Sequence, residues 1–331
     1  MRLVLCLAIL LAFTGVPVAG QENQPGQGTT GVQQSEGPPI RVVVEEVTVP
    51  FIVTDSRNRI ITDLTKEDFK VFEDKVEQPI SAFERQTDVP LRLGLMIDTS
   101  NSIRDRFAFE QRAASDFLRQ LLRPDRDLAF LASFDSMAEL VQDFTGDLDE
   151  LVAAIDSLRP GGGTALYDAI FYGSRDRLLE GAPDLGSYRR AMVILSDGED
   201  NQSRYSRLQA LEVAQRAEVI IYTISTNIRG VRMPGDRVLQ QFAEETGGRY
   251  FQPSNLQDLD VAFEAINTEL RSQYSISYQP STPRDGKYHE IEIEPQRRGL
   301  RVRARKGYFA TEPPGFIPAN PSGALPSSPS R

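Results

Sequence analysis

The feature that most constrains this chain is an apolar run at residues 91–97 that ends abruptly in polar side chains. Three of these side chains carry oxygen and stand at alternate positions: Asp98, Ser100 and Ser102. The apolar run predicts a buried strand, and apolar residues at three- and four-residue steps from Phe107 onward predict a helix after it. The oxygen-bearing side chains therefore lie in a strand-to-helix turn, where open α/β sheets bind their ligands.

The alternation of strand and helix continues to about residue 270. A second apolar run, Ala191 to Leu195, is followed by Ser196 and Asp197. Residues 128–134 and 138–141 predict two strands joined by a tight turn, which gives one antiparallel hairpin in an otherwise parallel pattern. About six strands alternating with helices predict an α/β fold, a doubly wound and mostly parallel six-stranded sheet of the Rossmann type.

The segments on either side of this domain, residues 40–88 and 273–310, are rich in short alternating apolar and polar runs that predict strands. Neither segment is large enough to bury a convincing core by itself. The termini of a doubly wound domain often lie close together, so such a domain can be inserted into another. We therefore expect the two segments to fold as one β-sandwich into which residues 89–272 are inserted.

The N-terminal segment of the chain predicts export. Residues 1–20 combine Arg2, an apolar run and small residues before Gln21, which is typical of a secretory signal peptide. The run is shorter than the roughly 20 residues that span a membrane, so we expect no transmembrane anchor in the mature chain. Cys6, the only cysteine, would be removed, which leaves no disulfide. Residues 21–39 predict a flexible leader and residues 311–331 a disordered tail. The expected location is the periplasm, the cell surface or the exterior.

The charge of the chain limits its partners. The formal net charge is -10 at pH 7, which argues against nucleic acid or an anionic membrane as the main partner. The arginines between Arg297 and Arg305 alternate with Val302 and Ala304, so we interpret them as one face of a strand.

Three predicted loops carry the oxygen ligands of a candidate metal site. The first holds Asp98, Ser100 and Ser102, the second follows three glycines with Thr164, and the third holds Asp197. If the strands before the two aspartates are neighbours, the loops converge on one crevice. Carboxylate and hydroxyl oxygens suit Mg²⁺, with Mn²⁺ or Ca²⁺ as alternatives. Two carboxylates leave such an ion under-neutralised, so an Asp or Glu from a partner could complete the shell.

These five residues resemble the metal-ion-dependent adhesion site of von Willebrand factor type A domains in type, order and separation. The resemblance covers residues 89–272 and implies that the serine and threonine hydroxyls coordinate the metal, while the aspartates bind it directly or through water. Asn101 stands where the motif often has glycine. Outside the domain, residues 64–74 and 303–308 resemble a group of exported bacterial proteins with a type A-related domain.

The same residues allow other interpretations. An isolated Asp-x-Ser-x-Ser is usually a helix cap, with Ser102 as the N-cap. Asp168 could support the metal or act as an exposed or hydrogen-bonded acid in the first turn of a helix. Glu199 and Asp200 are expected to be solvated loop charges or partner contacts. His289, the only histidine, lies in a predicted strand far from the crevice loops in sequence, which disfavours zinc and Ser-His-Asp chemistry.

The sequence therefore predicts an exported protein-binding module, not an enzyme, that captures an acidic side chain of a protein partner through Mg²⁺. One alternative is a structural or assembly protein of the cell envelope whose metal site is idle. A metal-assisted hydrolase is the least favoured hypothesis, because no residue is placed as an obvious general base.

Overall fold

The computed structural model describes residues 46–101, 104, 106–180, 188–227, 231–255, 257–281 and 285–310. The predicted signal peptide, leader and tail lie outside these residues, as does Ser102. Among the helices that the structure describes, none has the length and apolar character needed to cross a membrane.

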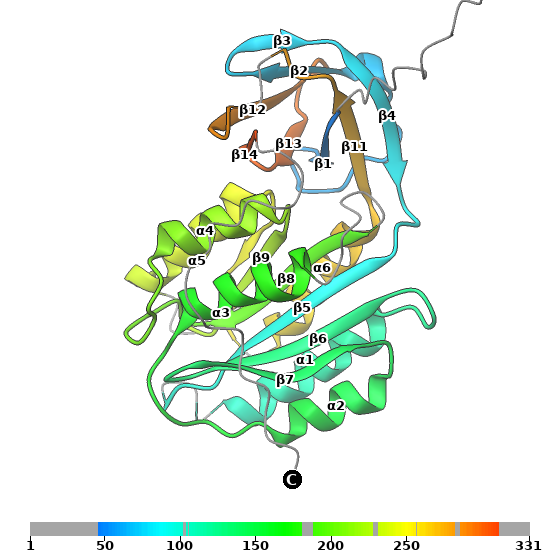
Figure 1. Ribbon diagram of the computed structural model, residues 1–331. Coiled ribbons are helices and arrows are strands. Elements are labelled where there is room, and N and C mark those ends of the chain that lie inside the picture. Colours follow the sequence, from blue (N-terminus) through cyan, green and yellow to red (C-terminus); the bar gives the residue numbers. More distant parts are fainter. Residues whose placement is uncertain are drawn as a thin grey trace, which may run out of the picture. The chain divides into compact units, whose positions relative to one another are not determined.

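The central element is a six-stranded sheet with the order β10-β9-β8-β5-β6-β7 (Figure 1). Its strands are β5 (Leu91–Asp98), β6 (Leu128–Phe134), β7 (Ala138–Thr145), β8 (Arg189–Ser196), β9 (Ile220–Ser225) and β10 (Tyr250–Phe251). All neighbouring pairs are parallel except β6 with β7, which pair antiparallel. The predicted doubly wound, mostly parallel six-stranded sheet with one antiparallel hairpin is confirmed.

Helices cover both faces of this sheet. One face packs against α1 (Phe107–Leu121), α2 (Leu148–Ser157) and α6 (Asp258–Arg271), and the other against α3 (Leu166–Tyr172), α4 (Arg207–Arg216) and α5 (Pro234–Thr246). A π-helical turn, η3 (Gly173–Leu179), continues α3. The rings of Phe117 in α1 and Phe263 in α6 stack with their centroids 4.5 Å apart. Because β5 and β8 are buried on both faces, each carries a nearly continuous apolar run in the sequence, broken by Arg92 in β5 and preceded by two arginines in β8.

The remaining strands form two four-stranded antiparallel sheets, β13-β1-β11-β4 and β14-β12-β2-β3. The N-terminal flank supplies β1 (Val47–Thr54), β2 (Phe69–Glu73), β3 (Val76–Gln78) and β4 (Ile80–Gln86), with a short helical turn, η1 (Lys66–Asp68), before β2. The C-terminal flank supplies β11 (Gln273–Tyr278), β12 (Tyr288–Pro295), β13 (Arg301–Ala304) and β14 (Gly307–Phe309).

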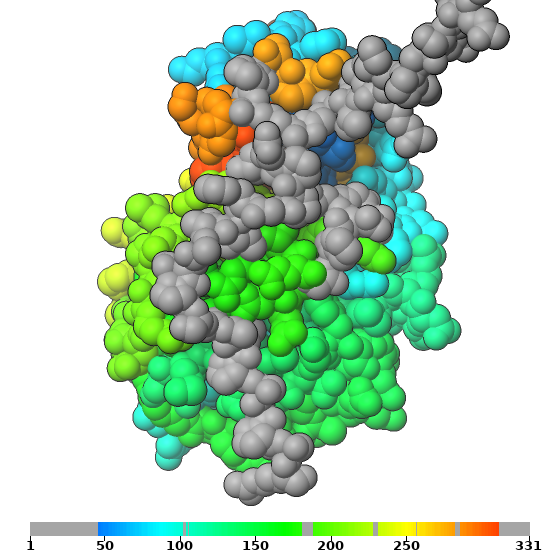
Figure 2. Space-filling model, viewed as in Figure 1, coloured from blue at the N-terminus to red at the C-terminus, as the bar shows by residue number. Residues whose placement is uncertain are grey.

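Both of these sheets contain strands from both flanks, and we call them together the β module. β11 lies between β1 and β4, and β12 lies between β14 and β2. Side chains of the two sheets share one buried cluster that includes Phe51, Phe69 and Tyr274. On the surface, the cyan N-terminal and orange C-terminal segments adjoin (Figure 2).

A buried polar network fixes the points where the chain passes between the β module and the α/β domain. Asp127, which is fully buried, accepts hydrogen bonds from the backbone N–H of Leu91 at 2.9 Å and from the guanidinium of Arg271 at 2.5 Å. The guanidinium of Arg189 donates to the backbone carbonyls of Gln86, at 2.9 Å, and Leu270. Only Ser272 separates α6 from β11, so the last helix leads directly into an inner strand of a β-module sheet.

Candidate functional site

Two of the predicted ligands stand at one edge of the six-stranded sheet because their strands are parallel neighbours. Asp98 is the last residue of β5, and Asp197 directly follows β8. Thr164 lies two residues before α3. Asp98, Ser100 and Thr164 are buried, and Asp197 is partly exposed.

Hydrogen bonds join the three loops to one another. The backbone N–H of Gly161 donates to the carbonyl of Thr99 at 2.6 Å, and the side-chain amide of Asn101 donates to the carbonyl of Gly162 at 3.1 Å, which connects the first and second loops. The Ser196 hydroxyl donates to Asp98 Oδ2 at 2.6 Å, which connects the third loop to the first.

Asn201 connects the second loop to the third. Its side-chain Oδ1 accepts from the backbone N–H of Thr164 at 3.0 Å, and its own N–H donates to the Thr164 carbonyl at 2.9 Å. Both the N–H and the carbonyl of Thr164 are therefore bonded to one residue of the Asp197 loop.

The carboxylate of Asp98 is buried among neutral donors. Its Oδ1 accepts from the backbone N–H of Ser100 at 2.8 Å, and no basic side chain among the described residues pairs with it. Burial raises the pKa of Asp98 to about 6, although hydrogen bonds from Ser196 and Ser100 oppose the shift, and the charge of Asp197 adds to it. A cation at this position would relieve the cost of that buried charge.

The backbone after Asp197 requires glycine. Gly198 has a φ of 79°, and a Cβ atom there would lie 2.2 Å from the carbonyl oxygen of Gly235 in α5. The N–H of Gly198 donates to the Ser196 hydroxyl at 3.0 Å. The first turn of α5 therefore lies directly against the Asp197 loop.

Residues 93–199 match the family model described as the von Willebrand factor type A domain. This chain contains a von Willebrand factor type A domain. Domains of this family are generally modules for protein interaction.

Solved structures with a similar fold share little sequence with the chain. The conserved hypothetical protein BatB from Bacteroides thetaiotaomicron is 18% identical with a TM-score of 0.44, over 55% of this chain and 100% of that one. Proximal thread matrix protein 1 from the mussel byssus, described with a zinc occupied MIDAS motif, is 16% identical with a TM-score of 0.48, over 60% of this chain and 50% of that one. A von Willebrand factor type A protein from Catenulispora acidiphila is 12% identical with a TM-score of 0.49, over 73% of this chain and 72% of that one. No curated protein sequence matches the chain significantly.

Asp168 and Asp200 hold the second and third loops of the type A domain together. Asp168 is buried and accepts from the backbone N–H groups of Arg204, at 2.9 Å, and Tyr205, at 3.0 Å. Asp200 accepts from the N–H of Tyr167 at 3.0 Å. The expectation that Asp200 is a solvated charge or a partner contact is therefore wrong, because its carboxylate is used inside the loop pair.

Glu110 is a buried acid that the sequence reasoning missed. It lies on α1 with 1% of its surface exposed, and its Oε1 accepts from Arg106 Nε at 3.1 Å. Its other oxygen has no hydrogen-bond partner among the described residues. Burial raises the pKa of Glu110 to about 8 against the opposing charge of Arg106, and the charges of Asp98 and Asp197 contribute to the increase.

The donor set at the three loops fits a hard divalent cation. The described residues contain no cluster of three or more His, Cys, Asp or Glu side chains that could hold a metal, so a metal here would depend on hydroxyl ligands. Asp98, Asp197, Ser100 and Thr164 offer carboxylate and hydroxyl oxygens in loops that hydrogen bonds already connect. These are the ligand types that Mg²⁺ prefers.

Proposed function

We propose that this protein is an exported binding module that captures an acidic side chain of a protein partner through a Mg²⁺ ion. The residues that would hold the ion are Asp98, Ser100, Ser102, Thr164 and Asp197. The main support is the buried Asp98 carboxylate, which has neutral donors around it and lies where three connected loops meet. The predicted signal peptide is the basis for export to the periplasm, the cell surface or the exterior.

The charge balance of the site favours a carboxylate as the group captured. Two aspartates and neutral hydroxyls only just balance a divalent cation, and Mg²⁺ retains water molecules that a ligand can replace. Where one of the two aspartates binds the ion through water, only one carboxylate contacts it, and an Asp or Glu oxygen from a partner would supply a second charged ligand in place of one water. Asp197, which is partly exposed, would stand nearest to solvent and therefore to the partner.

Capture from a cell-envelope extract tests the proposal. Immobilised wild-type protein is expected to retain a partner in Mg²⁺ and to release it in EDTA, whereas the Asp98→Ala variant retains none. Asp116→Ala is the matched control, because Asp116 is an exposed acid on α1 whose side chain is 63% accessible. Capture that survives both EDTA and Asp98→Ala would contradict the proposal and favour a structural role in which the metal site is idle.

A further inference from the structure

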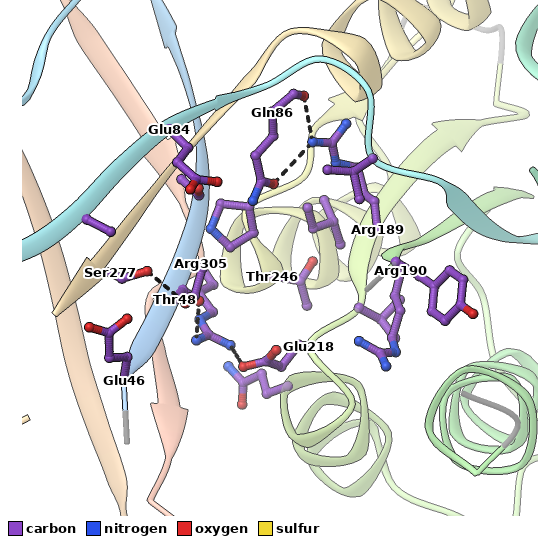
Figure 3. Close-up of a pocket in the computed structure, with 18 residues that line it drawn as sticks. Glu46, Thr48, Glu84, Gln86, Arg189, Arg190, Glu218, Thr246, Ser277 and Arg305 are labelled. Carbon is purple, nitrogen blue, oxygen red and sulfur yellow. Dashed lines mark hydrogen bonds and ion pairs between the residues drawn. The ribbon is translucent and has the colours of Figure 1, made fainter. Parts of the chain in front are cut away.

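A cavity of about 310 Å³ lies between the β module and the type A domain (Figure 3). Ser275 and Ser277 on β11 alternate with the core residues Tyr274 and Ile276, so their hydroxyls point away from the β-module core and line the cavity. The opposite wall includes Arg189, the first residue of β8. Because Asp197 follows the other end of β8, this cavity and the candidate metal site lie at opposite edges of the sheet.

Arg189 is a buried cation that has no counter-ion among the residues the structure describes. Only 5% of its surface is exposed, and its guanidinium donates to neutral oxygens of Gln86 and Leu270. No carboxylate of the described residues lies within ion-pair distance of it. Burial lowers the pKa of Arg189 to about 10. A buried charge is normally paired, so this unpaired guanidinium marks a place where an anion would be stabilised.

Two carboxylates at the cavity also form no ion pair with any described residue. Glu46 and Glu84 are exposed and line the cavity, and no ion pair joins either of them to a basic side chain in the described part of the chain. Figure 3 shows them on one side of the cavity, with Arg189 and Arg190 on the other. Glu218 already has a partner, because its carboxylate accepts a hydrogen bond from Arg305 at 2.7 Å. The cavity therefore presents positive charge at its buried wall and negative charge at its exposed side.

We propose that this cavity binds a small zwitterion of the size of a dipeptide. Its carboxylate would face Arg189, its ammonium group would face Glu46 and Glu84, and the Ser275 and Ser277 hydroxyls would bond its polar groups. The volume is at the lower end of the range for small-molecule sites, roughly 300–1,000 Å³. This assignment does not depend on the metal site.

Calorimetric titration of the full chain with three probes tests the charge requirement. Alanyl-alanine carries both charges, its N-acetyl form lacks the ammonium group, and its C-terminal amide lacks the carboxylate. We expect the free dipeptide to bind and each blocked form to bind about 1.5- to 5-fold more weakly, the range typical of one exposed charge pair. Absence of binding by all three probes at millimolar concentration, or equal binding by all three, would overturn the proposal.

Substitutions of cavity residues test where the dipeptide binds. The double change Glu46→Gln, Glu84→Gln affects exposed side chains only and is expected to weaken dipeptide binding at least about twofold. Glu292→Gln, Glu294→Gln makes the same charge change on the exposed face of β12 and should have no effect. Arg189→Gln should abolish binding. If that variant fails to fold, the Glu46 and Glu84 pair decides alone, and unchanged affinity in that pair refutes the assignment.

Discussion

Replacing Asn201 by alanine isolates the contribution of the loop connection to metal binding. The change removes the hydrogen bond from the Thr164 N–H to the Asn201 side chain, at 3.0 Å, and leaves the backbone bond to the Thr164 carbonyl, at 2.9 Å, in place. Asn201 is exposed, so the substitution creates no buried cavity. The change therefore loosens Thr164, one of the five predicted metal ligands, without replacing any of the five residues.

The expected effect on metal affinity is larger than the effect on the fold. Loss of a residue that orients a metal ligand typically weakens binding about 10–100-fold, or about 1.4–2.7 kcal/mol. Loss of one hydrogen bond typically lowers the free energy of unfolding by about 0.5–1.5 kcal/mol, and an exposed bond falls at the lower end of that range. Asn201→Ala should therefore lower the Mg²⁺ affinity while metal-free stability changes little.

Isothermal titration of Mg²⁺ measures the difference directly. Gln202→Ala is the matched control, because Gln202 contacts the Thr164 carbonyl only through its backbone N–H, at 3.0 Å. Asn201→Asp retains an acceptor oxygen and should restore binding, whereas the double change Asn201→Ala, Gln202→Asp adds the same charge and should not. Wild-type affinity in Asn201→Ala would refute the view that Asn201 positions Thr164 for the metal.

Three further results are expected. Gly198→Ala should lower the free energy of unfolding by at least about 1–2 kcal/mol in chemical denaturation, because φ is 79° and the new Cβ atom meets backbone; an unchanged value would contradict this geometry. His289 is buried, which lowers its pKa, but hydrogen bonds to Asp74 at 2.7 Å and Asp285 at 3.1 Å outweigh burial and raise the pKa above 6.5. The stability that this imidazolium contributes is complete below pH 6.5 and is lost as pH rises through the raised pKa. The melting temperature of wild type should therefore fall relative to that of His289→Gln between pH 6 and 9. Parallel profiles of the two proteins would exclude a contribution from the imidazolium. A chain that ends at Gln273 lacks most of β11 and all of β12, and hydrogen exchange should show residues 46–86 unprotected while the type A domain stays protected; protection of residues 46–86 would indicate an independent domain.

The sequence predicted the parts of this structure that depend on local patterns. The apolar runs of β5 and β8 are nearly continuous because both strands are buried on both faces, so their type and order could be read directly. Asp98 ends the first of these strands and Asp197 follows the second, so both could be placed at one edge of the sheet. The placement of His289 in a strand was also correct, but one of its two carboxylate partners, Asp74, lies 215 positions away, and no short-range pattern connects the two residues.

The residues that the sequence did not reveal act through contacts between distant segments. Nothing in the spacing of Asn201 indicates that it binds Thr164, 37 positions away. Ser196 reads as the last residue of a strand, although its hydroxyl reaches Asp98. Glu110 did leave a signal, because it lies three residues after Phe107 and four before Ala114, on the apolar face of α1. An acid on a buried helix face indicates a polar partner, which here is Arg106 at the start of the same helix.

The most direct measurement of the central claim is the melting temperature of the metal-free protein with and without Mg²⁺, for wild type and for the double variant Asp98→Ala, Asp197→Ala. An ion that binds only the folded state at a concentration about 100 times its Kd adds about 2.7 kcal/mol of stability, or about 5–10 °C for a domain of this size. We expect that increase for wild type and no increase for the variant. An equal shift in both proteins, or no shift in wild type, would contradict the assignment of these loops as a metal site.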